Sequence, residues 1–217
     1  MVKLRYIVFL KMLINISNTS RVLCNMKISD LFENDGNTMT LWHGGRGLEF
    51  SYNEMMPHKK GRWEHGPGLY LTTHYDTAFK YAKGGGKVYS VTIRKGTPID
   101  NVVVTLREAI DFVKRYAIKK FQNNIIDDLK QISYRNVQDS INIRAVVNLC
   151  LNYDALRPSS TVALRQFLIK NGADYEISPR FGGRDETIVI LFNPELITSV
   201  KPIKAAEVDV EDRIKDI

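Results

Sequence analysis

Three short segments of the chain contain residues whose types could do chemistry. The first holds a histidine followed by two glycines, the second holds several tyrosines, and the third holds a glutamate before an apolar run. Tyrosine rings attract flat cationic rings, and a carboxylate stabilises positive charge that develops in a transition state. Taken singly, each residue also has an ordinary structural interpretation. The segments are LWHGG (41–45), GPGLYLTTHYDTAFKYA (66–82) and GGRDETIVILF (182–192).

The order and spacing of these residues are more informative than any one of them. His43 precedes two glycines, Tyr70 and Tyr81 are eleven residues apart, and Glu186 opens the run ETIV. In this order the segments resemble the H-Y-E class of ADP-ribosyltransferases, the class of diphtheria toxin and the poly(ADP-ribose) polymerases. The resemblance spans residues 39–200. It implies an α+β fold with a split β-sheet core and a helical insertion.

The resemblance also implies that NAD⁺ is the substrate. Tyr70 and Tyr81 would sandwich the cationic nicotinamide ring. The backbone of Gly44 would hold the nicotinamide amide, and His43 would hydrogen-bond the adenosine ribose. Glu186 would be the catalytic residue, because a carboxylate stabilises the charge that builds on the nicotinamide ribose as the glycosidic bond breaks.

Two positions depart from the pattern of the polymerases. Ala78 stands where a serine usually touches the nicotinamide amide, and Gly45 stands where Ser or Thr usually follows His-Gly. Thr72 or Thr77 is expected to supply the missing hydroxyl, so we include Thr72 among the residues that bind NAD⁺.

The loop 58–65 (HKKGRWEH) is basic and contains two of the four histidines. It could hold a metal ion or a phosphate. We favour a flexible basic loop over the NAD⁺ cleft, with Arg62 or Lys60 near the diphosphate. No HExxH pattern is present, and Cys24 and Cys150 form no CxxC pair. We therefore expect neither a metal site nor a disulfide framework.

The loop before Glu186, SPRFGGRD (178–185), is expected to face the acceptor. Arg180 and Arg184 could meet phosphate groups, and Phe181 could stack on a base. The alternative is a solvated turn in which Phe181 only packs. Arginine-modifying enzymes of these families usually have Glu or Gln two residues before the catalytic glutamate. Arg184 occupies that position here, which argues against an arginine acceptor.

Composition is typical of a globular protein, with 44% apolar and 25% charged residues among 217. Lys and Arg number 31 against 24 Asp and Glu, which gives a net charge of +7. The excess lies in residues 1–170, whereas residues 207–216 are rich in acids. A basic balance suits an anionic partner such as a nucleic acid, although it also suits a solvated surface that happens to be basic.

The distribution of charged and apolar residues along the chain also predicts the domain boundaries. Residues 1–25 are basic and then apolar, which fits a non-native upstream extension before a normal start at Met26; a signal peptide or an ordinary N-terminal element are the alternatives. The apolar run is too short to span a bilayer. Residues 26–204 are expected to form one catalytic domain with a helical insertion at about 105–170. Residues 205–217 form an acidic tail.

Hydrophobic periodicity and Gly or Pro breaks predict the individual elements. Six strands are expected at 39–43, 68–72, 87–94, 174–177, 187–192 and 197–203. Helices are expected at 74–83, 106–125, 136–151 and 159–170.

The sequence therefore predicts a cytoplasmic mono-ADP-ribosyltransferase that acts on a macromolecule, with RNA or DNA favoured over protein and no membrane partner. Two alternatives stay open. One is transfer to a protein side chain other than arginine, and the other is an inactive module that binds NAD⁺ or ADP-ribose. By analogy alone, the setting is a phage or toxin-type effector, with an antitoxin or inhibitor protein as its partner.

Overall fold

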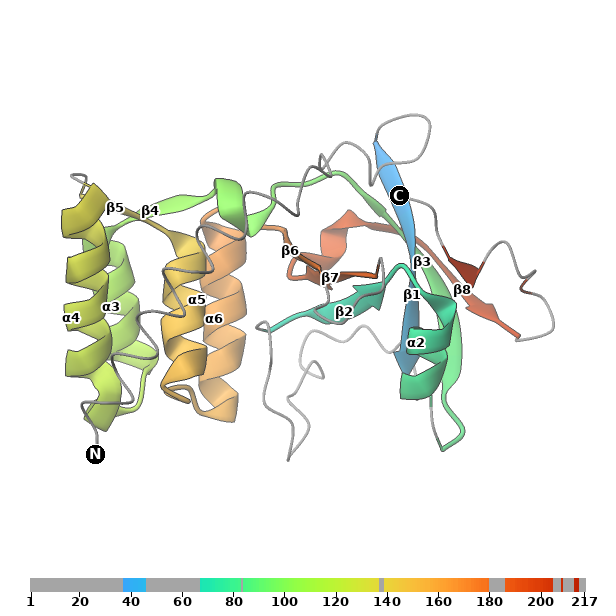
Figure 1. Cartoon of the computed structure of the whole chain (residues 1–217), viewed down its shortest axis with the longest axis horizontal. Coiled ribbons are helices and arrows are strands. Elements are labelled where there is room, and N and C mark those ends of the chain that lie inside the picture. Colours follow the sequence, from blue (N-terminus) through green and yellow to red (C-terminus); the bar gives the residue numbers. More distant parts are fainter. Residues whose placement is uncertain are drawn as a thin grey trace.

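A computed structural model describes residues 37–45, 67–82, 84–136, 139–179, 186–204, 208 and 213–214. Within these ranges the chain forms a mixed α+β structure. An antiparallel sheet of six strands lies at one end, and a layer of helices lies at the other (Figure 1). The α+β class expected from the sequence is confirmed.

The sheet brings together strands that are far apart in the sequence. Every neighbouring pair is antiparallel. The strands follow one another across the sheet as β6 (Tyr175–Pro179), β7 (Thr187–Leu191), β2 (Leu69–Thr72), β1 (Thr38–Gly45), β3 (Lys87–Arg94) and β8 (Ile197–Ile203).

Helix α2 (Tyr75–Tyr81) follows β2 closely, and the other described α-helices lie between β3 and β6 in the sequence. The latter are α3 (Leu106–Tyr116), α4 (Lys119–Asn136), α5 (Ile143–Asn152) and α6 (Pro158–Lys170). A ribbon of β4 (Val103–Thr105) and β5 (Ser140–Asn142) and two 3-10 helices, η2 (Ile99–Asn101) and η3 (Pro194–Leu196), complete the described elements.

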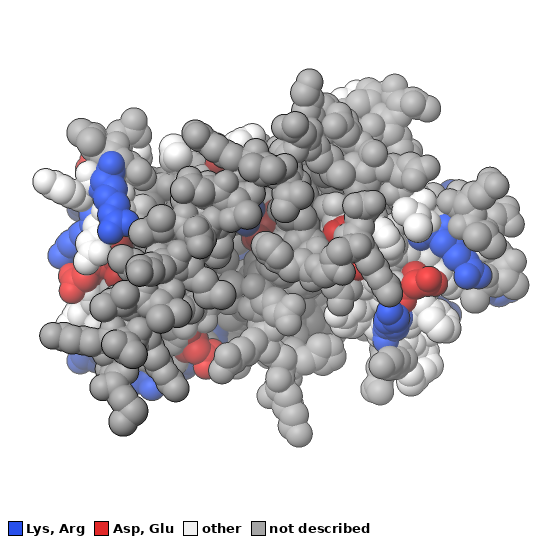
Figure 2. Space-filling model, in the orientation of Figure 1, with Lys and Arg blue, Asp and Glu red and all other residues white. Residues whose placement is uncertain are grey.

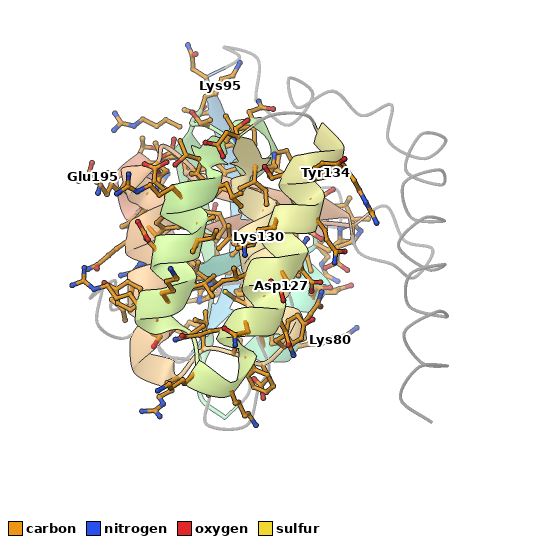
Figure 3. All side chains as sticks on the ribbon, turned by 90° about the vertical axis from the view of Figure 1, so that its left-hand side faces the viewer. Lys80, Lys95, Asp127, Lys130, Tyr134 and Glu195 are labelled. Carbon is orange, nitrogen blue, oxygen red and sulfur yellow. The ribbon has the colours of Figure 1, made fainter. Side chains whose placement is uncertain are left out.

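The sheet buries both of its faces around β2 and β7. Leu69 and Leu71 point into a core on one face. Tyr70, between them, packs with Ile188 and Ile190 of β7 against the core of the helical layer. This alternation is the period of two that a strand imposes on its side chains. It explains why the helices α3–α6 gather beside this part of the sheet, as Figures 1 and 3 show from two directions.

One predicted helix is wrong in its boundaries. The apolar row over 106–125 belongs to two helices, because α3 ends at Tyr116 and α4 begins at Lys119. Both helices bury their apolar side chains in the same core, so the row continues across the break. The Gln122 side chain donates two hydrogen bonds to carbonyl groups at the end of α3 and so stabilises the link.

The helix expected over 136–151 also begins later than predicted. Residues 140–142 form β5, and the Asn142 side chain accepts a hydrogen bond from the Arg144 amide, which starts α5. A capping asparagine is a common start signal for a helix. Neither β4 nor β5 was predicted.

None of the described helices combines the length and the apolar content needed to cross a bilayer. Residues 1–25 and most of the 205–217 tail lie outside the described residues, so the expectations about them stay predictions.

Candidate functional site

The site expected from the sequence lies where β1 and β2 meet. Trp42 and Thr72 are the residue pair that joins these two strands, whereas β1 pairs with β3 along its whole length. Beyond this pair the side chain of His43 bridges the two strands, because its Nδ1 donates a 3.0 Å hydrogen bond to the carbonyl oxygen of Tyr70. His43 and Tyr70, which are 27 residues apart in the sequence, are therefore in direct contact.

This hydrogen bond determines which ring nitrogen of His43 carries the proton. Burial lowers the pKa of His43 below its ordinary value of 6.5, and the Tyr70 carbonyl opposes this only in part. The imidazole is thus neutral at pH 7 and carries one proton. A carbonyl can only accept, so that proton is on Nδ1 and Nε2 keeps its lone pair. Nε2 is therefore suited to accept a hydrogen bond from a hydroxyl group.

Glu186 lies immediately before β7 and is buried, with 3% of its surface exposed. Thr72 Oγ1 donates a 2.8 Å hydrogen bond to Glu186 Oε1. The same Thr72 oxygen accepts a 3.1 Å hydrogen bond from the backbone amide of His74. A buried carboxylate is costly unless it is hydrogen-bonded, so Thr72 contributes to holding Glu186 in place.

Thr73 secures the residue after Glu186. Its backbone amide donates to the Thr187 carbonyl at 3.1 Å, and its hydroxyl accepts from the Thr187 amide at 3.1 Å. The His74 ring also bonds this hydroxyl at 2.9 Å. The turn Thr72–His74 thus attaches the end of β2 to the start of β7 through both the backbone amide and the backbone carbonyl of Thr187. Thr73 and His74 were not predicted to belong to the site. For Thr73 the available signal was the pair of consecutive threonines, Thr72 and Thr73, at the end of a strand.

Gly44 is packed against helix α2. A Cβ added at Gly44 would lie 1.7 Å from the carbonyl oxygen of Ala78 and 3.1 Å from the amide nitrogen of Ala82. The helix backbone thus occupies the space that a side chain would need. Close helix packing explains why glycine is required here, and a backbone contact from Gly44 to a nicotinamide amide stays a prediction.

Ala78 is buried in the same interface, in a cluster with Trp42, Tyr75 and Val88. Thr77 is buried as well. The Thr72 hydroxyl, which we expected to contact NAD⁺, both donates and accepts within the protein. Its observed partners connect it to Glu186, and a direct contact with NAD⁺ stays a prediction.

The two tyrosines have different surroundings. Tyr70 is half-buried on β2 and packs against the helical layer. Tyr81 is the last residue of α2 and is 68% exposed, so its ring is accessible for stacking. Their sandwich around a nicotinamide ring stays a prediction.

Five residues expected to bind substrates, with Lys60 as the alternative to Arg62, lie outside the described residues: Lys60, Arg62, Arg180, Phe181 and Arg184. Their contacts with a diphosphate or an acceptor stay predictions. Within the described ranges, no group of three His, Cys, Asp or Glu side chains is placed to hold a metal ion. An enzyme that works without a metal ion stays a prediction.

A second buried carboxylate, Glu176 on β6, was not predicted. Arg144 donates to Glu176 at 2.6 Å and to Asp100 at 2.8 Å, so the start of α5 is tied to β6 and to η2. Burial raises the pKa of Glu176 to about 7, although the adjacent Arg144 acts to lower it. The cluster links the helical layer to the sheet.

Comparison with known proteins gives no assignment, since no family model, no curated protein and no solved structure matches the chain.

Proposed function

We propose that the chain is an NAD⁺-dependent mono-ADP-ribosyltransferase in which Glu186 is the catalytic carboxylate. One observation carries the proposal. Glu186 is buried and hydrogen-bonded to Thr72, at the end of the strand that also carries Tyr70, and His43 is hydrogen-bonded to Tyr70. His43, Tyr70 and Glu186 come from three separate segments of the sequence. They are thus linked by these two hydrogen bonds and by strand β2, which carries both Tyr70 and Thr72.

The fold is compatible with the same proposal. Strands β1 and β2 pair at Trp42 and Thr72. By contrast, β2 pairs with β7, and β1 pairs with β3, over several residues. This arrangement supports a sheet split into two halves, with the candidate site at the split. The helices α3–α6 then correspond to the expected helical insertion.

In the proposed reaction the bond between the nicotinamide nitrogen and the ribose C1′ breaks. Nicotinamide leaves as a neutral molecule with the bonding electron pair, and positive charge develops on the ribose. An acceptor oxygen or nitrogen attacks C1′ and loses its proton. Glu186 stabilises the positive charge, on the order of 3–4 kcal/mol for one well-placed electrostatic group. Its burial strengthens this effect because water screens the charge less.

The other residues bind and orient. His43 accepts a hydrogen bond from a ribose hydroxyl at Nε2, and the exposed Tyr81 ring stacks on the nicotinamide together with Tyr70. Thr72 is a positioning residue, since its hydroxyl is hydrogen-bonded to Glu186. We favour a nucleic acid as the acceptor, because the basic excess lies in residues 1–170 and suits a polyanion.

The test is transfer of label from NAD⁺ carrying ³²P in the adenylate phosphate. The full chain is incubated with separate pools of RNA, DNA and protein, and each product is treated with nuclease or with protease. The proposal expects label on nuclease-sensitive material. Label on nuclease-resistant, protease-sensitive material would replace the nucleic-acid acceptor by a protein. Neither transfer nor nicotinamide release in any pool would contradict the enzyme and favour the inactive module.

A further inference from the structure

The link between α3 and α4 has an unusual concentration of positive charge. Residues 114–121, KRYAIKKF, contain four cations and no acid. Lys114 and Arg115 lie at the end of α3, and Lys119 and Lys120 begin α4. All four side chains are exposed. We call residues 114–121 the basic elbow.

The charges of the basic elbow are not neutralised within the described part of the chain, where none of its four cations takes part in an ion pair. Two other cations of the same helices are paired. Arg107 lies 3.9 Å from Asp111, and Lys130 lies 3.9 Å from Asp127 on the outward side of α4 (Figure 3). The four cations of the elbow therefore differ from Arg107 and Lys130 in having no acidic partner among the described residues.

Local stability does not account for the two lysines of α4. Lys119 and Lys120 occupy its first turn, and this turn has no acidic residue. The N-terminal end of a helix carries partial positive charge, so cations there are unfavourable. The adjacent loop adds no net charge, because it contains one exposed acid, Asp154, and one exposed cation, Arg157. The described residues at this end of the helical layer thus carry a net positive charge. Figure 2 shows described Lys and Arg side chains together with Asp and Glu side chains along the side of the molecule that the helical layer forms.

The backbone of the basic elbow is firmly held. The side-chain amide of Gln122 donates 2.9 Å hydrogen bonds to the backbone carbonyl oxygens of Lys114 and Ala117. The Ile118 amide donates to the Ala155 carbonyl at 2.7 Å, which fastens the elbow to the loop between α5 and α6. A fixed backbone reduces the ordering cost when a ligand binds.

Two cations of the elbow lie next to aromatic rings of the elbow. Lys120 Nζ lies 4.4 Å from the centre of the Phe121 ring, and the Arg115 guanidinium lies 5.3 Å from that of Tyr116. Both rings are half-buried against the helical core. The large exposed apolar side chains of the described residues lie elsewhere. The elbow thus offers charge without an apolar group for insertion into a bilayer, which favours a phosphate polymer over a membrane surface.

We infer that the basic elbow is a nucleic-acid-binding surface that contacts the phosphates of the acceptor strand. The inference rests on the proposed nucleic-acid acceptor for its biological meaning, but the binding is measured without NAD⁺. Its failure is therefore distinguishable from failure of the transferase proposal.

The experiment compares two variants of the full chain with equal change in net charge. The elbow variant is K114Q/R115Q/K119Q/K120Q. The matched control is R107Q/K130Q/R135Q/K170Q, which neutralises four exposed cations elsewhere in the helical layer. Circular dichroism and thermal unfolding check that both variants fold. Fluorescence anisotropy with a labelled 20-nucleotide single-stranded RNA, the same sequence as DNA, and a duplex measures affinity at several salt concentrations.

The elbow variant is expected to lose at least about tenfold in affinity at low salt, since each phosphate contact contributes counterion release. The slope of log affinity against log salt should become shallower by about 3, because four contacts contribute roughly 0.7 each on a single strand. The control variant should keep most of the affinity and the slope. Equal losses in both variants, or no loss in either, would overturn the inference. Binding to phosphatidylserine vesicles but to none of the oligonucleotides would overturn it in favour of a membrane.

Discussion

Thr72 donates a 2.8 Å hydrogen bond to Glu186, and this bond joins the end of β2 to the start of β7. The two residues are 114 positions apart in the sequence. The bond connects the strand of Tyr70 to the carboxylate that the proposed reaction needs. Since Thr72 also accepts from the His74 amide, its hydroxyl couples α2 to Glu186 as well.

Replacing Thr72 by Val should therefore lower kcat for transfer by roughly 10–100-fold, because a hydrogen bond to a charged group contributes about 1.5–3 kcal/mol. KM for NAD⁺ should change little, since Thr72 acts through Glu186. Thr72→Ser keeps the hydroxyl and should restore most of the rate. Steady-state kinetics of nicotinamide release measures both parameters. A rise in KM with unchanged kcat would instead indicate a direct contact with NAD⁺.

Tyr81→Ala should raise KM for NAD⁺ about tenfold, whereas Tyr81→Phe should have little effect, because stacking requires the ring and not the hydroxyl. The Tyr81 side chain is mostly exposed, so neither variant should unfold more easily. Phe79→Ala, which removes another exposed ring of α2, is the matched control. If all three variants bind NAD⁺ equally well, Tyr81 does not belong to the site.

Gly44→Ala tests the packing of α2 on β1. The added methyl group would lie 1.7 Å from the Ala78 carbonyl oxygen, which belongs to a helix backbone and cannot move alone. We expect a loss of about 3 kcal/mol or more in the free energy of unfolding, at the upper end for overpacked positions. Urea unfolding measures it. A variant as stable as the unchanged chain would show that α2 does not lie against Gly44.

Glu176→Gln tests the cluster that joins the helical layer to the sheet. Burial raises the pKa of Glu176 from 4.5 to about 7 in the folded chain. The folded state therefore keeps a proton that the unfolded state releases above pH 4.5. This contribution to stability is complete below pH 4.5 and is lost as pH rises to about 7, by up to about 3 kcal/mol.

Unfolding by urea at several pH values between 4.5 and 8 measures this contribution. Gln cannot titrate, so the variant should show a flatter dependence of unfolding free energy on pH than the unchanged chain. The same slope in both proteins would mean that other groups cause it.

Much of the sheet was predictable from local pattern. The strand Lys87–Arg94 alternates in hydrophobicity after a run of glycines, and its observed bounds agree with the prediction. The break between α3 and α4 was not predictable in this way, because the apolar row continues through both helices. The strands β4 and β5 have three residues each, which is too short to show a period.

The candidate site was predictable in its residue types but not in its connections. The spacing of His43, Tyr70 and Glu186 suggested a shared site through a family resemblance. No local pattern could show that Thr73 bonds the backbone of Thr187, because that contact depends on the pairing of β2 with β7. The same holds for the packing of α2 against Gly44, which requires the observed position of the helix on the sheet.

If Glu186 is the catalytic carboxylate, Glu186→Gln removes the negative charge that the proposed reaction needs. Transfer of label from NAD⁺ and nicotinamide release are measured for this variant and for Glu195→Gln, which changes an exposed carboxylate on η3 (Figure 3). We expect Glu186→Gln to lose on the order of 100-fold or more in kcat while NAD⁺ binding and thermal unfolding stay nearly unchanged. Glu195→Gln should behave like the unchanged chain. Transfer by Glu186→Gln at close to the normal rate would contradict the catalytic role of Glu186.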